Sequence, residues 1–178
     1  MSATPEILSD LVSHEIRVEL DAALGKITHC VNQLTDDQLW WRPSESMNSV
    51  ANLLLHLCGN VRQWIVSGVG GAADVRERQK EFDQRGPIPK RELLQQLGRA
   101  VDEAKRVLSE TSAEELLRVR PVQGNDVTGM QAMLHSAAHF RGHVQEIVHM
   151  TRCQLGDSYE FDFIPPSPGE EDASVTAR

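Results

Sequence analysis

Four histidines gather in the stretch HSAAHFRGHVQEIVH, which covers residues 135–149. His135, His139 and His143 follow one another at four-residue intervals, and His149 comes six residues later. On a helix, side chains four residues apart share one face with Cβ atoms about 5–6 Å apart, so two imidazoles can bind one metal ion. The spacing is also typical of a pH-sensitive stripe or an ordinary polar helix face. A metal site therefore needs a third ligand from elsewhere in the chain.

The candidate for that third ligand is His56, in the apolar segment SVANLLLHLCGN. An unpaired buried imidazole costs about 1–3 kcal/mol, so a histidine here must have a partner. Taken alone, His56 is a neutral core histidine hydrogen-bonded to a backbone or side-chain group. Taken with His139 and His143, it completes a three-histidine site inside a helical bundle. Three protein nitrogens leave an open position, which is the catalytic rather than the structural pattern, and an ion there can acidify water or polarise a substrate oxygen.

The remaining histidines are not expected to bind the ion. His135 lies one turn before the pair and is expected beside the ligands or at the surface. His149 points about 120° away from His143 and is expected in solvent or at a packed edge. His14 and His29 have no assigned role. Because no glutamate follows His139, the general base of the zinc-protease HExxH motif is missing.

Apolar residues recur at steps of three and four along most of the chain, which predicts amphipathic helices. The four long helices are expected at residues 6–34, 48–67, 90–111 and 128–155. Capping-box pairs are expected at Thr35 with Gln38 and at Thr128 with Gln131. The link at residues 68–89 is expected to hold a short helix, and residues 119–122 form either an irregular link or a short strand.

The predicted fold class is therefore all-α: a four-helix bundle with a long link between helices 2 and 3, plus short accessory helical turns. Residues 1–165 are expected to form a single domain, and residues 166–178 a disordered tail.

Composition limits the functional classes. The net charge of -8, with no cluster of five basic residues, argues against nucleic acid and anionic membranes as partners. No segment is apolar enough to cross a bilayer, and the N-terminus lacks a secretory pattern. The three cysteines are widely separated and form no CxxC pair, which favours a reducing, cytoplasmic location.

Two segments, SVANLLLHLCGNVRQWI at residues 49–65 and MLHSAAHFRGHVQEIVHMTR at residues 133–152, resemble the DinB-like superfamily (the DinB/YfiT group of proposed metalloenzymes). The resemblance extends over residues 6–163. It implies that His56, His139 and His143 hold a divalent metal, that the long link separates the second and third helices, and that the protein is a homodimer. Relatives of this kind include thiol-dependent S-transferases and a mycothiol-dependent isomerase.

The chain departs from the family pattern after the last of these histidines. Gln145 stands where glycine is common, and Glu146 stands where glutamine is common. This difference removes none of the expected metal ligands. It does mean that the substrates of the family cannot be assigned to this protein in detail.

Two functions follow as hypotheses. The first is a metal-dependent enzyme in which zinc, nickel or iron activates water or a low-molecular-weight thiol for hydrolysis of, or S-transfer to, a small molecule. No general base is identified, although Glu146 and Glu15 are candidates, and the catalytic residues stay unassigned. The second is a non-catalytic, metal-binding or stress-associated dimeric bundle. A plainer third reading is an empty site whose histidines bond one another and buried water.

Overall fold

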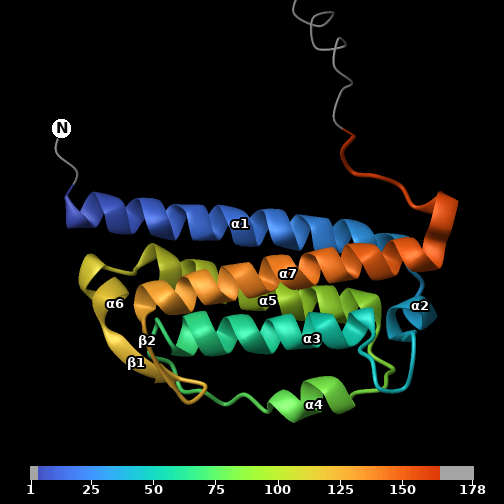
Figure 1. Cartoon of the computed structure of the whole chain (residues 1–178), viewed down its shortest axis with the longest axis horizontal. Helices are drawn as coiled ribbons and strands as arrows, with labels where there is room; N and C mark the ends of the chain where they lie inside the picture. Colours follow the sequence, from blue (N-terminus) through green and yellow to red (C-terminus); the bar gives the residue numbers. More distant parts are fainter. Residues whose placement is uncertain (1–3, 165–178) are drawn as a thin grey trace, which may run out of the picture.

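The computed structural model describes residues 4–164, and the expected disordered tail at residues 166–178 lies outside them. This part of the chain is mostly helical, as predicted. Four long helices lie side by side in Figure 1: α1 (Pro5–Gln33), α3 (Val50–Val61), α5 (Lys90–Ser109) and α7 (Gly129–Leu155). Each of the four begins within two residues of its predicted start. No helix within residues 4–164 combines the length and hydropathy needed to span a membrane.

Shorter elements connect the long helices. They are α2 (Asp36–Trp40), the π-helix η1 (Arg62–Ser67), α4 (Arg78–Asp83), α6 (Ala113–Leu117), β1 (Val119–Val122), β2 (Asn125–Thr128) and the 3-10 turn η2 (Gly156–Ser158). The helix expected in the long link is α4. The sequence did not predict α6.

The strand considered for residues 119–122 is β1, and it pairs with β2 in an antiparallel hairpin that the sequence did not predict. Two residues join the strands, Gln123 at φ 54° and Gly124 at φ 78°. Successive positive φ values are typical of the two-residue turn that matches the twist of a hairpin. Glycine adopts this conformation easily but glutamine rarely does, so the turn gave a weak sequence signal.

Capping boxes fix where the helices start, and so which residues face the core. Thr35 with Gln38 and Thr128 with Gln131 form the two predicted boxes. A third box, Ser49 with Asn52, starts α3. Each box satisfies two backbone groups that would otherwise be unpaired at a helix end. The box at Ser49 fixes the start of the helix that carries His56.

The second long helix changes character after Val61. The sequence predicted one continuous helix over residues 48–67, but its last part is η1, in which the Gly68 amide bonds the Gln63 carbonyl. Wider helical turns of this kind occur often near functional sites. Trp64 and Ile65 are buried there, as the apolar pattern predicted.

Side-chain contacts define the relative directions of the helices. Asn52, early in α3, contacts the backbone of Gln84 just before α5, while Arg62 beyond the end of α3 pairs with Glu103 late in α5. These two helices therefore run parallel, as the long link between them allows. By contrast, α7 runs antiparallel to α3, because His56 meets His139 while the later Asn60 meets the earlier Ser136.

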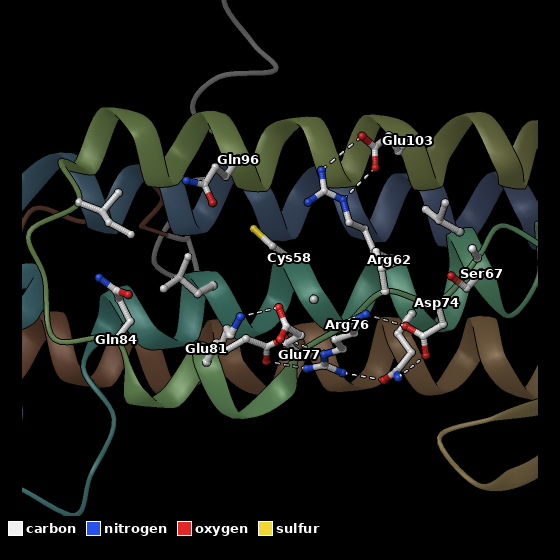
Figure 2. A pocket seen from close by; sticks show the side chains of 18 residues that line it. Cys58, Arg62, Ser67, Asp74, Arg76, Glu77, Glu81, Gln84, Gln96 and Glu103 are labelled. Carbon is white, nitrogen blue, oxygen red and sulfur yellow. Dashed lines mark hydrogen bonds and ion pairs between the residues drawn. The ribbon is translucent and has the colours of Figure 1, made fainter.

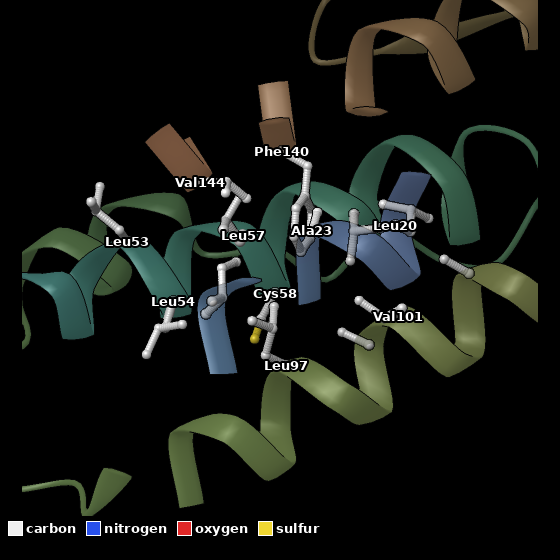
Figure 3. Packing of buried hydrophobic residues seen from close by; sticks show 14 of the residues in the cluster. Leu20, Ala23, Leu53, Leu54, Leu57, Cys58, Leu97, Val101, Phe140 and Val144 are labelled. Atoms are coloured by element: carbon white, nitrogen blue, oxygen red, sulfur yellow. The ribbon is translucent and has the colours of Figure 1, made fainter. Parts of the chain in front are cut away.

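The hydrophobic core fills the space between the four long helices (Figure 3). Burying one leucine-sized side chain contributes about 1.5–3 kcal/mol, so this cluster supplies the main stabilising free energy. Most apolar residues of the four long helices are buried or half-buried, and Leu8 and Leu134 are among the exposed ones. Phe140 of α7 is fully buried in this core.

Candidate metal centre

The structure brings His56, His139 and His143 together between α3 and α7. One nitrogen from each ring lies within 4.8 Å of the other two. The Nε2 atoms of His56 and His139 are 2.9 Å apart, and the rings of His139 and His143 lie 4.5 Å apart between centroids. Imidazole nitrogens at about 2.0–2.1 Å from a tetrahedral ion are about 3.3 Å from one another. Small side-chain rotations would give this geometry.

The fold explains why these rings meet. His56 is buried on the face of α3 that turns toward α7. His139 and His143 are one turn apart on α7 and half-buried. The antiparallel crossing of the two helices places the single histidine opposite the pair.

A carboxylate fixes the orientation of the His56 ring. Its Nδ1 lies 2.9 Å from Glu81 Oε2, and ionised carboxylate oxygens only accept hydrogen bonds. Nδ1 therefore carries the hydrogen, and Nε2 keeps its lone pair facing the other two histidines. This is the histidine–carboxylate arrangement that accompanies most histidine metal ligands.

The same arrangement occurs at His143, where Nδ1 lies 2.7 Å from Glu146 Oε2. Glu146 was a candidate general base, and the structure places it against the His143 ring, where it orients that ring. Glu15, the other candidate, is exposed on α1, and its side chain makes no hydrogen bond within residues 4–164. Nδ1 of His143 also donates to its carboxylate, which leaves Nε2 free as the ligand atom.

The pKa values of His139 and Glu81 favour a neutral His139 ring and an ionised Glu81 carboxylate. Burial, together with the charges of His143 and His56, lowers the pKa of His139 to about 4. Burial alone would raise the pKa of Glu81, but hydrogen bonds from Arg76 and His56 outweigh it and lower that pKa. At neutral pH, His139 therefore offers a lone pair and Glu81 is ionised.

These donors fit a divalent first-row metal. Neutral imidazole suits zinc, nickel and iron, and three nitrogens from the protein are the donor set of several catalytic zinc sites. The two carboxylates supply the hydrogen-bond acceptors that such ligands need on their other nitrogen.

His135 lies outside the three-histidine group. It is exposed and stacks on Trp64 with ring centroids 3.9 Å apart, while its ring lies 5.8 Å from that of His139. The position beside the ligands agrees with the sequence prediction. His149 is exposed, as expected, and its Nε2 lies 3.6 Å from Cys153 Sγ.

The two histidines of α1 are remote from the three-histidine group. His14 is exposed, and His29 contacts the Glu160 carbonyl at 2.6 Å.

Sequence reasoning missed Glu81 and Arg76, which both belong to the long link. Arg76 Nε donates to Glu81 Oε1 at 2.7 Å, and both side chains are largely buried. In the sequence they stand among many charged residues, which are typical of an exposed segment, so nothing indicates that these two are buried. No periodic signal could have separated them from their neighbours.

A cavity of about 560 Å³ lies on the other side of this ion pair, between α3, the link and α5 (Figure 2). Glu81 and Arg76 line it together with Cys58 and the Arg62–Glu103 pair, and none of the three histidines does. Burial raises the pKa of the Cys58 thiol to about 12. Cys58 is therefore protonated at neutral pH and is a poor nucleophile.

Helices α1, α3, α5 and α7, with their three-histidine group, define the class of protein. The structure resembles the crystal structure of a DinB-like protein, YjoA of Bacillus subtilis, with a TM-score of 0.63 at 16% sequence identity. The alignment covers 83% of this chain and 96% of YjoA. The fold that the resemblance to the DinB-like superfamily implies is thereby confirmed.

Residues 10–167 match the family described as "Protein of unknown function (DUF1572)". Because this match covers most of the chain, the protein belongs to that family. No curated protein matches the chain.

Proposed function

We propose that His56, His139 and His143 hold a divalent metal ion at the centre of a four-helix bundle. The observation that carries the proposal is the convergence of one nitrogen from each ring, from two helices, to within 4.8 Å. Two of the three rings have a carboxylate on Nδ1 that directs Nε2 toward the group. Histidines that lie together by chance would not be expected to share a carboxylate partner on Nδ1.

A divalent ion held by these residues would supply Lewis acidity and would lower the pKa of a water or thiol bound to it. The chain's own residues orient the ligands: Glu81 fixes His56 and Glu146 fixes His143. His139 contributes a neutral ring because its surroundings disfavour the charged form. The three nitrogens leave room for a fourth ligand from outside the protein.

The proposed reaction is S-transfer to, or hydrolysis of, a small molecule, with zinc, nickel or iron as the ion. A thiol reaction would use a low-molecular-weight thiol from solution, because the pKa of Cys58 keeps its thiol protonated. The exposed Cys153 contacts His149 and not the three ligands.

A second candidate is metal binding without catalysis, in a dimeric bundle. The observation that favours it is the position of the cavity in Figure 2, which lies across Glu81 from the histidines and does not include them. Turnover of small thioester, ester or thiol-acceptor substrates by the metal-loaded protein would favour the enzyme. Tight, stabilising metal binding without turnover would favour the alternative, and light scattering would test the dimer.

The direct experiment is elemental analysis of untagged protein, followed by titration with zinc, nickel and ferrous ions. We expect one ion per chain in the wild type and its loss in His139→Ala. Removing a ligand should cost more than the 10–100-fold that loss of a ligand's hydrogen-bond partner costs. Absence of stoichiometric binding in the wild type, or equal binding in His139→Ala, would contradict the proposal.

A further inference from the structure

We infer that the buried Arg76–Glu81 pair is the positioning device of the metal centre, and that Gly59 provides the space it occupies. The long link between α3 and α5 is thus a part of the site. The inference rests on the proposed metal site and adds to it a set of residues that act through His56.

Four hydrogen bonds hold the side chains of Arg76 and Glu81 in place. Arg76 donates from Nε to Glu81 Oε1 at 2.7 Å and from Nη2 to Glu81 Oε2 at 2.8 Å. Its Nη1 donates to Gln63 Oε1 at 2.8 Å. Glu81 Oε2 also accepts from His56 Nδ1. Two-point contact between a guanidinium and a carboxylate fixes the plane of both groups.

The orientation of His56 depends on this pair. Arg76 Nη2 lies 3.1 Å from His56 Nδ1, but it donates to Glu81 Oε2 and to the His56 carbonyl because Nδ1 itself carries a hydrogen. The Phe82 ring packs against the His56 ring with centroids 4.9 Å apart. Glu81 thus sets the tautomer, and the neighbouring Phe82 limits rotation of the ring.

The segment that carries Glu81 is itself attached to α3. The side-chain amide of Asn52 donates to the carbonyls of Glu81 and Gln84, at 2.8 and 3.0 Å. Asn52 also belongs to the capping box that starts α3. One buried side chain therefore connects the start of the histidine helix with the backbone of the link.

Gly59 makes the approach possible. A Cβ at this position would lie 1.9 Å from Glu81 Oε1 and 2.7 Å from Arg76 Nε. Any other residue would displace the end of the Glu81 side chain, which is flexible, while α3 itself could stay intact. Gly59 thus has a role in the site although it contacts no ligand nitrogen.

The test uses two variants that perturb the pair differently, Glu81→Gln and Gly59→Ala. The first removes the charge and keeps the shape, and the second displaces the carboxylate by a methyl group. Gly142→Ala is the matched control, since it lies on α7 between the two ligands and a Cβ there meets nothing within 4 Å. His139→Ala serves as the reference for loss of the site.

Two readouts apply. Competition with a chromophoric chelator gives the zinc dissociation constant, which we expect to rise about 10–100-fold in Glu81→Gln and Gly59→Ala and to change less than about 2-fold in Gly142→Ala. Nitrogen-15 imidazole spectra of the metal-free proteins report the His56 tautomer. We expect the Nδ1–H form in the wild type and a mixture in both variants.

The outcomes distinguish the proposed metal site from the positioning role of the Arg76–Glu81 pair. Wild-type protein that binds no zinc, or binds it as well after His139→Ala, contradicts the proposed function, while the tautomer measurement in metal-free protein still tests the positioning role. If the wild type binds zinc through His139 but both variants keep its affinity and its His56 tautomer, the inference is wrong. An Nε2–H tautomer in the wild type would also overturn it.

Discussion

Two histidines of the candidate metal centre have a carboxylate partner, and the two carboxylates differ in how they support their rings. Glu81 reaches His56 from a separate segment, is paired with Arg76, and has a side chain only 11% exposed. Glu146 lies three residues after His143 on the same helix, and its side chain is 44% exposed. A buried ion pair fixes a geometry strongly and is costly to break, whereas a surface pair contributes little. Equivalent substitutions of Glu81 and Glu146 should therefore change the stability and the zinc affinity by different amounts.

The largest expected difference is in the free energy of unfolding. Glu81→Ala leaves the guanidinium of Arg76 buried without its partner, and loss of one member of a buried pair costs about 3–5 kcal/mol. Glu146→Ala removes an exposed contact and should change stability by no more than about 0.5 kcal/mol. Urea unfolding of both metal-free variants measures the difference. Equal effects would contradict the contrast between the two supports.

The stability of the protein should depend on pH through His139, which, unlike His56 and His143, has no carboxylate partner within residues 4–164. Burial and neighbouring histidines lower its pKa from 6.5 to about 4 in the folded protein. The unfolded chain then binds more protons between these values, so stability should fall as pH falls from about 6.5 to 4 and recover above that range. Denaturant unfolding of metal-free protein at several pH values tests this.

His139→Asn is the control for that pH series, since asparagine is polar and does not titrate. Its stability should vary less with pH over the same interval. A slope identical to the wild type would show that other groups cause the dependence.

The smallest effect is expected at the exposed support. Glu146→Gln keeps an acceptor for His143 Nδ1 and removes only a solvent-screened charge, so zinc affinity should weaken by about 5-fold or less. A 10–100-fold loss, as expected for Glu81→Gln, would mean that the two carboxylates act equally despite their different burial.

The same contrast explains what the sequence could and could not predict. Helix starts were accurate because capping boxes such as Thr128 with Gln131 are local, and the candidate ligands His139 and His143 share one helix. Glu146 was named as a candidate general base, but its contact with His143 was not predicted. The Arg76–Glu81 pair forms only because the link folds back onto α3, and no local sequence pattern predicts how the link folds.

Two local features were also not predicted. The π-helical turn at Trp64 differs from an α-helix by one backbone hydrogen-bond step, which leaves the apolar periodicity almost unchanged. The hairpin partner β2 is exposed or half-buried and has one apolar residue, Val127, so it lacked the alternation typical of a strand.

The central claim is that His56 on α3 and the two histidines on α7 bind one ion. Zinc X-ray absorption on untagged, zinc-loaded protein tests it most directly, compared with His56→Ala. We predict three imidazole nitrogens at about 2.0–2.1 Å in the wild type and two in the variant. A wild-type spectrum with fewer than three imidazoles, or one that His56→Ala leaves unchanged, would contradict the account.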